Sequence, residues 1–145
     1  RVPGVCRKPV GDGCLIMSEP EGELVIRVTA MPTDLNPYGG VFGGWLMCQL
    51  ALGASSLVTR QTGLKAVVVG ATDFAFPGVM QVGDELNVFA QVVRTGRTSI
   101  TVRTHGYGRA RASNDHVEVA NGSFTFVVRD ANDKPCPVDA GMRAA

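Results

Sequence analysis

The sequence lacks the close ligand pairs that metal centres use. None of its four cysteines forms a C-x-x-C pair, and it contains only two histidines. A structural zinc site needs shorter ligand spacing, so we expect no metal site. Cys48 falls in an apolar stretch with helical spacing, where a buried free thiol is the ordinary finding. Free thiols favour a reducing compartment, so we expect a cytoplasmic protein.

An excess of charge and long apolar runs are also missing. Fourteen basic and 13 acidic residues leave a formal net charge of +1, which argues against a nucleic-acid-binding face. Apolar runs such as Ala66–Gly70 are too short to span a bilayer, so no membrane segment is expected. With 145 residues, of which 45% are hydrophobic and 19% charged, the chain has the size and composition of one folded domain.

Alternating hydrophobic residues predict five strands, because every second side chain of a strand points to the same face. The predicted strands are Glu23–Ala30, Ala66–Phe76, Asp84–Arg94, Thr98–Tyr107 and Val117–Arg129. Short turns separate the last strands, which should therefore form an antiparallel meander.

Residues 43–62 have the spacing of a helix instead. Apolar side chains recur there every three or four positions, as expected for a helix buried along one side. Gly53 weakens such a helix, so close packing against another backbone must favour it. A single helix cannot cover both faces of a sheet. We therefore predict an α+β fold, with a curved antiparallel sheet around one long helix and dimerisation covering the remaining surface.

The two ends of the chain are rich in proline and glycine and have no lasting periodicity. We expect an extended N-terminal arm over residues 1–22, a folded domain over 23–130 and a C-terminal tail over 131–145. Both ends should lie on the surface or on a partner subunit.

The segment Met31–Met47, between the first strand and the helix, carries the most chemical information. Its glycines leave amides uncovered at the helix N-terminus, where they have no intrahelical partner and the helix dipole is positive. An oxygen that becomes negative in a transition state could lie against the amides of Gly43 and Gly44. Alternatively, the glycines only form the turn and allow close packing.

The run Met-Pro-x-Asp-x-Asn-x-x-Gly-x-x-Phe-Gly-Gly-Trp-Leu-Met in this segment resembles bacterial acyl-CoA thioesterases of the YciA type. Further similarity lies at Thr72-Asp73-Phe74-x-x-Pro77, at Val82-Gly83-Asp84 and at 94–99, so that it spans roughly residues 23–129. The resemblance implies a hotdog fold and a homodimer, often three dimers in a hexamer, with active sites between subunits. It also implies acyl thioesters of coenzyme A as substrates, with no separate cofactor.

The sequence departs from this family at the catalytic carboxylate. YciA-type enzymes have an aspartate after the first glycine of the motif, where this chain has Gly40. Related hotdog thioesterases use an acid on the long helix, where this chain has Ala51 and no acid from Gly43 to Lys65. Thioester hydrolysis needs a group that activates water or attacks directly, so the base is displaced or missing.

Asp73 is the first candidate for a displaced base, because it lies in an apolar, valine-rich strand. Capping a turn or pairing with an arginine is its alternative role. Asp34 and Asn36 match the family motif and are expected to shape the loop or to position water. Cys48 is a weaker candidate, as a nucleophile near the helix N-terminus.

Coenzyme A carries phosphates, which guanidinium and hydroxyl groups bind well. Arg94, Arg97, Thr98 and Ser99 cluster at a turn between two strands, and the matching segment of the resembling thioesterases lies near the nucleotide. A plain hairpin with solvated arginines is the alternative. A second arginine patch lies at 109–111.

These residues lead to one principal hypothesis and two alternatives. The principal hypothesis is hydrolysis of acyl-CoA to a free acid and coenzyme A, with the thioester carbonyl against Gly43 and Gly44 and a carboxylate, first of all Asp73, activating water. The first alternative is a hotdog protein that binds acyl-CoA or another ligand without turnover, as Gly40 suggests. The second is an enzyme for carrier-bound or aromatic thioesters with its base at an unexpected position.

Overall fold

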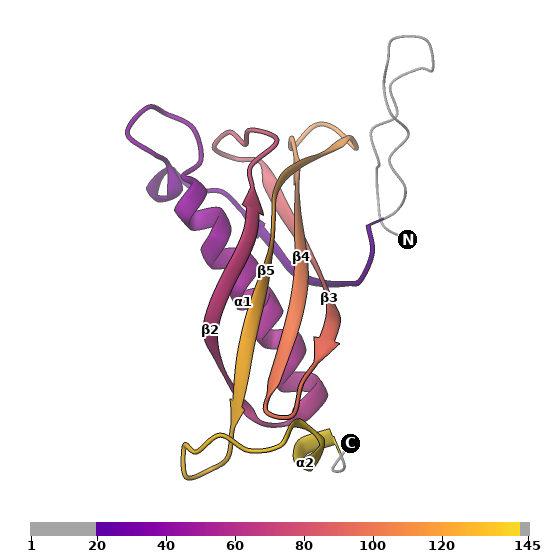
Figure 1. The fold of residues 1–145 in the computed structure, drawn as a ribbon. Helices are drawn as coiled ribbons and strands as arrows, with labels where there is room; N and C mark the ends of the chain where they lie inside the picture. Colours follow the sequence, from indigo (N-terminus) through magenta and orange to yellow (C-terminus); the bar gives the residue numbers. More distant parts are fainter. Residues whose placement is uncertain (1–19, 143–145) are drawn as a thin grey trace.

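The computed structural model describes residues 20–142 (Figure 1). The predicted strands and helix all form, with boundaries that differ by at most two residues. Most of the predicted N-terminal arm lies outside the described residues. The elements are β1 (Glu23–Thr29), a 3-10 turn (Pro32–Asp34), α1 (Gly43–Thr62), β2 (Lys65–Ala75), β3 (Glu85–Thr95), β4 (Ser99–Arg109), β5 (His116–Arg129) and the short α2 (Val138–Met142).

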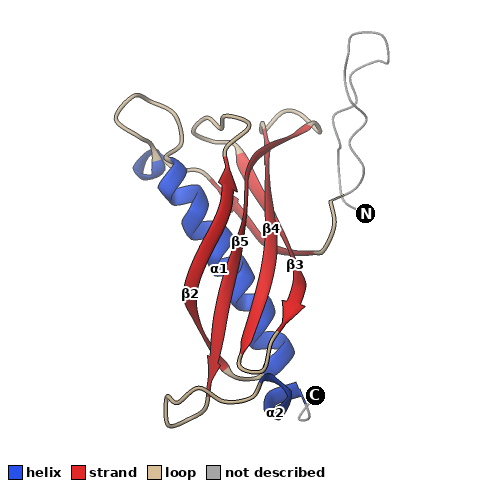
Figure 2. Ribbon diagram, in the orientation of Figure 1, coloured by secondary structure: helices blue, strands red, loops and turns tan. Residues whose placement is uncertain are grey.

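The five strands form one antiparallel sheet in the order β1-β3-β4-β5-β2. The consecutive strands β3, β4 and β5 form the predicted meander, and β2 pairs with β5 at one edge. In Figure 2 the sheet curves around α1, which runs along one face from end to end. The predicted α+β architecture is confirmed.

The core lies between α1 and the inner face of the sheet. Alternate residues of β4 and β5 face the helix, and one side of α1 faces them. The fully buried contributors include Leu50 and Val58 of α1, Val102 of β4 and Phe126 and Val128 of β5.

Gly53 lies where α1 crosses β1. A Cβ atom at this position would be 2.5 Å from Cγ2 of Val25 and 3.1 Å from Cγ1 of Ile26. Such distances are too short for a real side chain, so glycine lets the helix approach the strand. The close packing predicted at this glycine is confirmed, but the nearest atoms belong to side chains of β1 and not to a backbone.

The first part of the C-terminal segment packs on the subunit's own fold. The amide of Val138 donates to the carbonyl of Arg97 at 2.8 Å, and the amide of Cys136 donates to the carbonyl of Val128 at 3.1 Å. Val138 is 2% exposed, and α2 contacts α1. Residues 136–138 therefore connect the end of β5 to the β3–β4 turn through backbone hydrogen bonds.

Candidate active site

Asn36 closes the loop that leads into α1. Its side-chain oxygen accepts hydrogen bonds from the backbone amides of Tyr38 at 2.8 Å and Gly40 at 3.2 Å, and its backbone amide donates to the carbonyl of Gly40 at 2.7 Å. Asp34 accepts the amide of Met31 at 2.9 Å and so caps the 3-10 turn. Both side chains thus make the loop-shaping contacts expected of them.

The amides at the start of α1 are open. Phe42 is the N-cap residue. Its backbone is extended, and its side chain makes no capping hydrogen bond. Leu46 is the first helix residue whose amide donates to a preceding carbonyl, that of Phe42, at 3.2 Å. Within residues 20–142, no acceptor is found for the amides of Gly43 and Gly44, so these donors are available to a ligand oxygen.

Two aromatic rings flank these amides. The ring of Phe42 occupies the space that a Cβ atom of Gly44 would need. Phe76 follows the end of β2, and its Cε1 atom lies 3.6 Å from the Cβ position of Gly43. Apolar neighbours lower the local dielectric, which strengthens the interaction of the amides with a developing negative charge.

A cavity of about 390 Å³ lies beside the helix start. Its lining is mostly apolar and consists of Thr33, Asp34, Leu35, Phe42, Gly44, Trp45 and Cys48. The cavity therefore brings Asp34 and Gly44 together. Cys48 is exposed here as a free thiol, so the prediction of a buried thiol was wrong. The reason is helical geometry: two residues from both Leu46 and Leu50, Cys48 points away from the core.

Gly40, at the position where the family resemblance predicts a carboxylate, has room for a Cβ atom. Its φ is not in the left-handed region, and among the atoms of the described residues only Nδ2 of Asn36, at 3.5 Å, lies within 4 Å of an added Cβ. Glycine is therefore not required here by sterics or by backbone conformation. A Cβ atom at position 40 fits the loop without rearrangement.

Asp73 lies at a β-bulge near the end of β2. It has a φ of 57°, and the pairing of β2 with β5 shifts register between Thr72 and Ala75. Asp73 is exposed in the single subunit, so the apolar setting predicted for it was wrong. The valines around it belong to an edge strand, whose side chains stay partly open to solvent.

Arg94, Arg97, Thr98 and Ser99 lie at the β3–β4 turn, at the opposite end of the molecule from the start of α1 (Figure 1). The helix between the two ends has 20 residues and is therefore about 30 Å long. Both arginines are exposed. One subunit thus does not bring the predicted nucleotide-binding cluster to the predicted catalytic loop.

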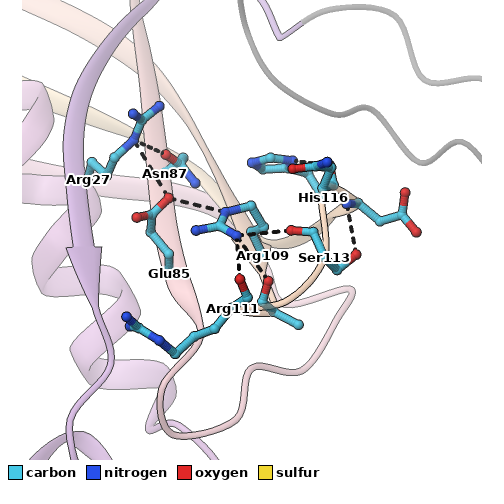
Figure 3. Close-up of polar contacts among 10 residues, drawn as sticks. Arg27, Glu85, Asn87, Arg109, Arg111, Ser113 and His116 are labelled. Atoms are coloured by element: carbon cyan, nitrogen blue, oxygen red, sulfur yellow. Dashed lines mark hydrogen bonds and ion pairs between the residues drawn. The ribbon is translucent and has the colours of Figure 1, made fainter.

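Figure 3 shows that the second arginine patch includes a structural residue. Nη1 of Arg109 donates to the carbonyls of Ala110, Arg111 and Ser113 at 2.9–3.2 Å, while its Nε contacts Glu85 at 3.4 Å. Nearby, Nε of Arg27 donates to Oδ1 of Asn87 at 2.7 Å. Arg109 therefore organises the β4–β5 loop through its Nη1 and Nε donors.

A polar network on the outer face of the sheet was missed at the sequence level. Asn121 of β5 accepts from Arg103 of β4 at 2.6 Å and donates to Glu118 at 2.5 Å. Glu118 also lies 3.5 Å from Nδ1 of His105. Burial, together with the charge of Glu118 and a hydrogen bond to it, raises the pKa of Tyr107 to about 12. Strand alternation could place these residues on one face, but their pairing depends on the register of β4 and β5.

Within the described part of the chain, no helix is long and apolar enough to cross a membrane. No group of three or more His, Cys, Asp and Glu side chains among these residues could hold a metal ion. The two cysteines that the structure describes, Cys48 and Cys136, are both unpaired.

Comparison with known proteins gives consistent matches. The thioesterase superfamily model matches residues 38–109. An uncharacterised acyl-CoA thioester hydrolase of Zymomonas mobilis is 40% identical over 119 residues, covering 82% of this chain and 80% of that protein. The acyl-CoA thioester hydrolase YciA of Salmonella typhimurium is 34% identical over 122 residues, covering 82% and 92% of the two chains.

Solved structures agree with these relatives. HI0827, a hexameric broad-specificity acyl-coenzyme A thioesterase crystallised as an aspartate-to-alanine mutant, has a TM-score of 0.79 at 30% identity, covering 86% of this chain and 95% of that one. Cj0915 of Campylobacter jejuni, a hexameric thioesterase with the hotdog fold, has a TM-score of 0.77 at 25% identity, covering 85% and 95%. Fold and matches together define a thioesterase-like protein with the hotdog fold. More narrowly, the chain belongs to the YciA-type family of acyl-CoA thioester hydrolases.

Proposed function

We propose that this protein hydrolyses acyl-CoA thioesters to a free acid and coenzyme A. The observation that carries the proposal is the pair of open amides at Gly43 and Gly44, flanked by aromatic rings and adjoining an apolar cavity. Such a site offers donors to an oxyanion and space for an apolar chain. Relatives named acyl-CoA thioester hydrolase or acyl-coenzyme A thioesterase support the same chemistry.

In the proposed reaction, the thioester carbonyl oxygen accepts from the amides of Gly43 and Gly44. The Asp73 carboxylate takes a proton from a water molecule whose oxygen attacks the carbonyl carbon. The tetrahedral oxyanion then collapses, the carbon–sulfur bond breaks, and the coenzyme A thiolate leaves with the proton that Asp73 took from water, which regenerates the carboxylate. Asp34 and Asn36 hold the loop, through contacts that fix the entry to α1.

We further propose a homodimer in which the β2 edges of two subunits pair. The free edge of β2 carries exposed apolar side chains, Val67, Val68 and Val69 among them, which a second copy would cover. Antiparallel pairing about a two-fold axis sets the β3–β4 turn of one subunit toward the catalytic loop of the other. This arrangement would let Arg94, Arg97, Thr98 and Ser99 serve the phosphates of a substrate bound at the partner's loop. Three such dimers would make the hexamer described for related thioesterases.

The unpaired cysteines support the proposal of a reducing, cytoplasmic location. Phosphate binding at the β3–β4 turn and catalysis at the loop need no cofactor beyond the coenzyme A of the substrate itself.

The test is thiol release from short, long and aromatic acyl-CoAs, with the reaction of the protein's own thiols subtracted. Asp73→Asn should lower kcat by about 10²–10⁴-fold, the usual worth of a general base. Asp133→Asn is a matched control, because Asp133 is the other non-glycine residue with left-handed φ among residues 20–142, at 62°, and it lies in the loop after β5. Full activity in Asp73→Asn would overturn the assignment of the base.

A second function is favoured by the empty carboxylate position at Gly40 and by Ala51 on the helix. It is binding of an acyl-CoA without turnover. Calorimetry with the same thioesters separates the two proposals, since binding without any thiol release would support this one and exclude hydrolysis.

A further inference from the structure

Arg103 joins three strands at the bulge that contains Asp73. From β4, its Nη2 donates to Oδ1 of Asn121 at 2.6 Å, and its Nη1 donates to Oγ of Ser123 at 3.4 Å, both on β5. The same Nη1 reaches the carbonyl oxygen of Asp73 on β2, also at 3.4 Å. One guanidinium group thus spans β5 and contacts the edge strand where its pairing is irregular.

The bulge needs such support. Thr72 pairs with Ser123 and Ala75 pairs with Asn121, so two residues of β2 face only Gly122 of β5. Asp73 adopts a left-handed φ of 57°, which costs an L-residue free energy and persists only where the surroundings fix it. Bulges of this kind redirect a side chain out of the regular pleat.

The bulge is fixed from both faces of the sheet. On the inner face, the ring of Phe74 occupies the space above Gly122 and packs edge-on against Phe124, with ring centroids 5.1 Å apart. On the outer face, the contact that reaches the backbone of the bulge is the one from Arg103. The inner contact anchors Phe74, whereas the outer contact is made to Asp73 itself.

The acceptors of Arg103 are neutral oxygens. Among the described residues, no carboxylate lies within ion-pair distance of its guanidinium group. Asn121, its shortest contact, is held in turn by Glu118, which orients the amide oxygen toward Arg103. The guanidinium group is therefore directed by a hydrogen-bond network toward the bulge.

We propose that Arg103 is a positioning residue for the reaction: it holds the bulge from which Asp73 projects and thereby fixes the carboxylate that activates water. The inference rests on the proposed function, in which Asp73 is the base. A base displaced by about 1 Å loses on the order of 10²-fold in rate, so the contact affects turnover more than substrate binding.

The test compares Arg103→Met, which keeps the length of the side chain but removes its donors, with Arg103→Lys and Thr101→Val. Thr101 is the matched control, because its hydroxyl also bridges β4 and β5, at 3.2 Å from Thr125, without reaching β2. Arg103→Met should lower kcat about 10–100-fold with KM changed less than about threefold. Arg103→Lys should recover part of the loss, and Thr101→Val should stay within about twofold of the parent.

The pair of variants decides whether Arg103 acts through Asp73. In the Asp73→Asn background, Arg103→Met should cause no further loss of kcat, because the group that it positions is already gone. An equal loss in both backgrounds, or an unchanged kcat in Arg103→Met alone, would overturn the proposal.

Amide hydrogen exchange at residues 72–75 provides a readout independent of activity. Arg103→Met should speed exchange there by more than about tenfold, relative to 66–69 in the same strand. If the parent protein released no thiol at all, the proposed function would fail. Unchanged exchange at the bulge would refute the positioning role by itself, whatever the turnover.

Discussion

Introducing an aspartate at position 40 should restore catalysis to a protein that has lost Asp73. Position 40 is half-buried, lacks a left-handed φ, and places an added Cβ 3.5 Å from Nδ2 of Asn36. That nitrogen can donate to the new carboxylate, since the bonds that shape the loop use the oxygen of the same amide. Replacing a loop glycine at a compatible φ also reduces the entropy of the unfolded chain, by about 0.4–1 kcal/mol. The fold should therefore tolerate Gly40→Asp.

A general base typically raises the rate by about 10²–10⁴-fold, and this range limits the size of the effect. Since the loop is not adjusted to a carboxylate at position 40, we expect Gly40→Asp to raise kcat/KM of Asp73→Asn by about 10–100-fold. Gly40→Asn is the control, with the same shape and no base. Thiol release at neutral pH measures the rates, and thermal melts should show midpoints within about 4 °C of the parent. Equal rates for Gly40→Asp and Gly40→Asn, with both folded, would refute the reasoning.

Three further predictions concern stability and assembly. Gly53→Ala should lower the free energy of unfolding by about 1 kcal/mol in urea melts, because overpacking against Val25, at 2.5 Å, outweighs the gain in helix propensity. Burial raises the pKa of Tyr107 to about 12. The contribution of this tyrosine to the free energy of unfolding is therefore complete below about pH 10 and is lost as the pH rises through 12. Tyr107→Phe should flatten this decline in the free energy of unfolding. Val68→Glu, on the exposed edge of β2, should shift sedimentation toward monomer, and an unchanged mass would contradict β2 pairing.

Hydrophobic periodicity was sufficient for the elements of the fold. The alternation in Thr98–Tyr107 and the helical spacing after Gly43 predicted β4 and α1 because each buries one face. Small residues around Gly53 correctly indicated that a strand lies close to the helix. Local patterns suffice in these cases because the spacing of the apolar residues directly shows which face is buried.

The same reasoning predicted less of the candidate active site. The exposure of Asp73 depends on the sheet order, which makes β2 an edge strand. Its bulge depends on the register with β5, and the contact with Arg103 joins residues 30 positions apart. Cys48 was assigned to the core because its neighbours in sequence are apolar, although its angle around the helix points it into the cavity.

The strand order also determines when the active site can form during folding. The hairpins of β3, β4 and β5 close over short turns, whereas β1 and β2 pair with strands at least 46 residues away along the chain, as in Glu23 with Ala90 and Ala75 with Asn121. Long loops cost more entropy to close, so the meander should assemble first and both edge strands should dock later. The edge proposed for dimerisation and the bulge of Asp73 both belong to β2. Activity should therefore appear after the bulk of the secondary structure, in a phase whose rate increases with protein concentration.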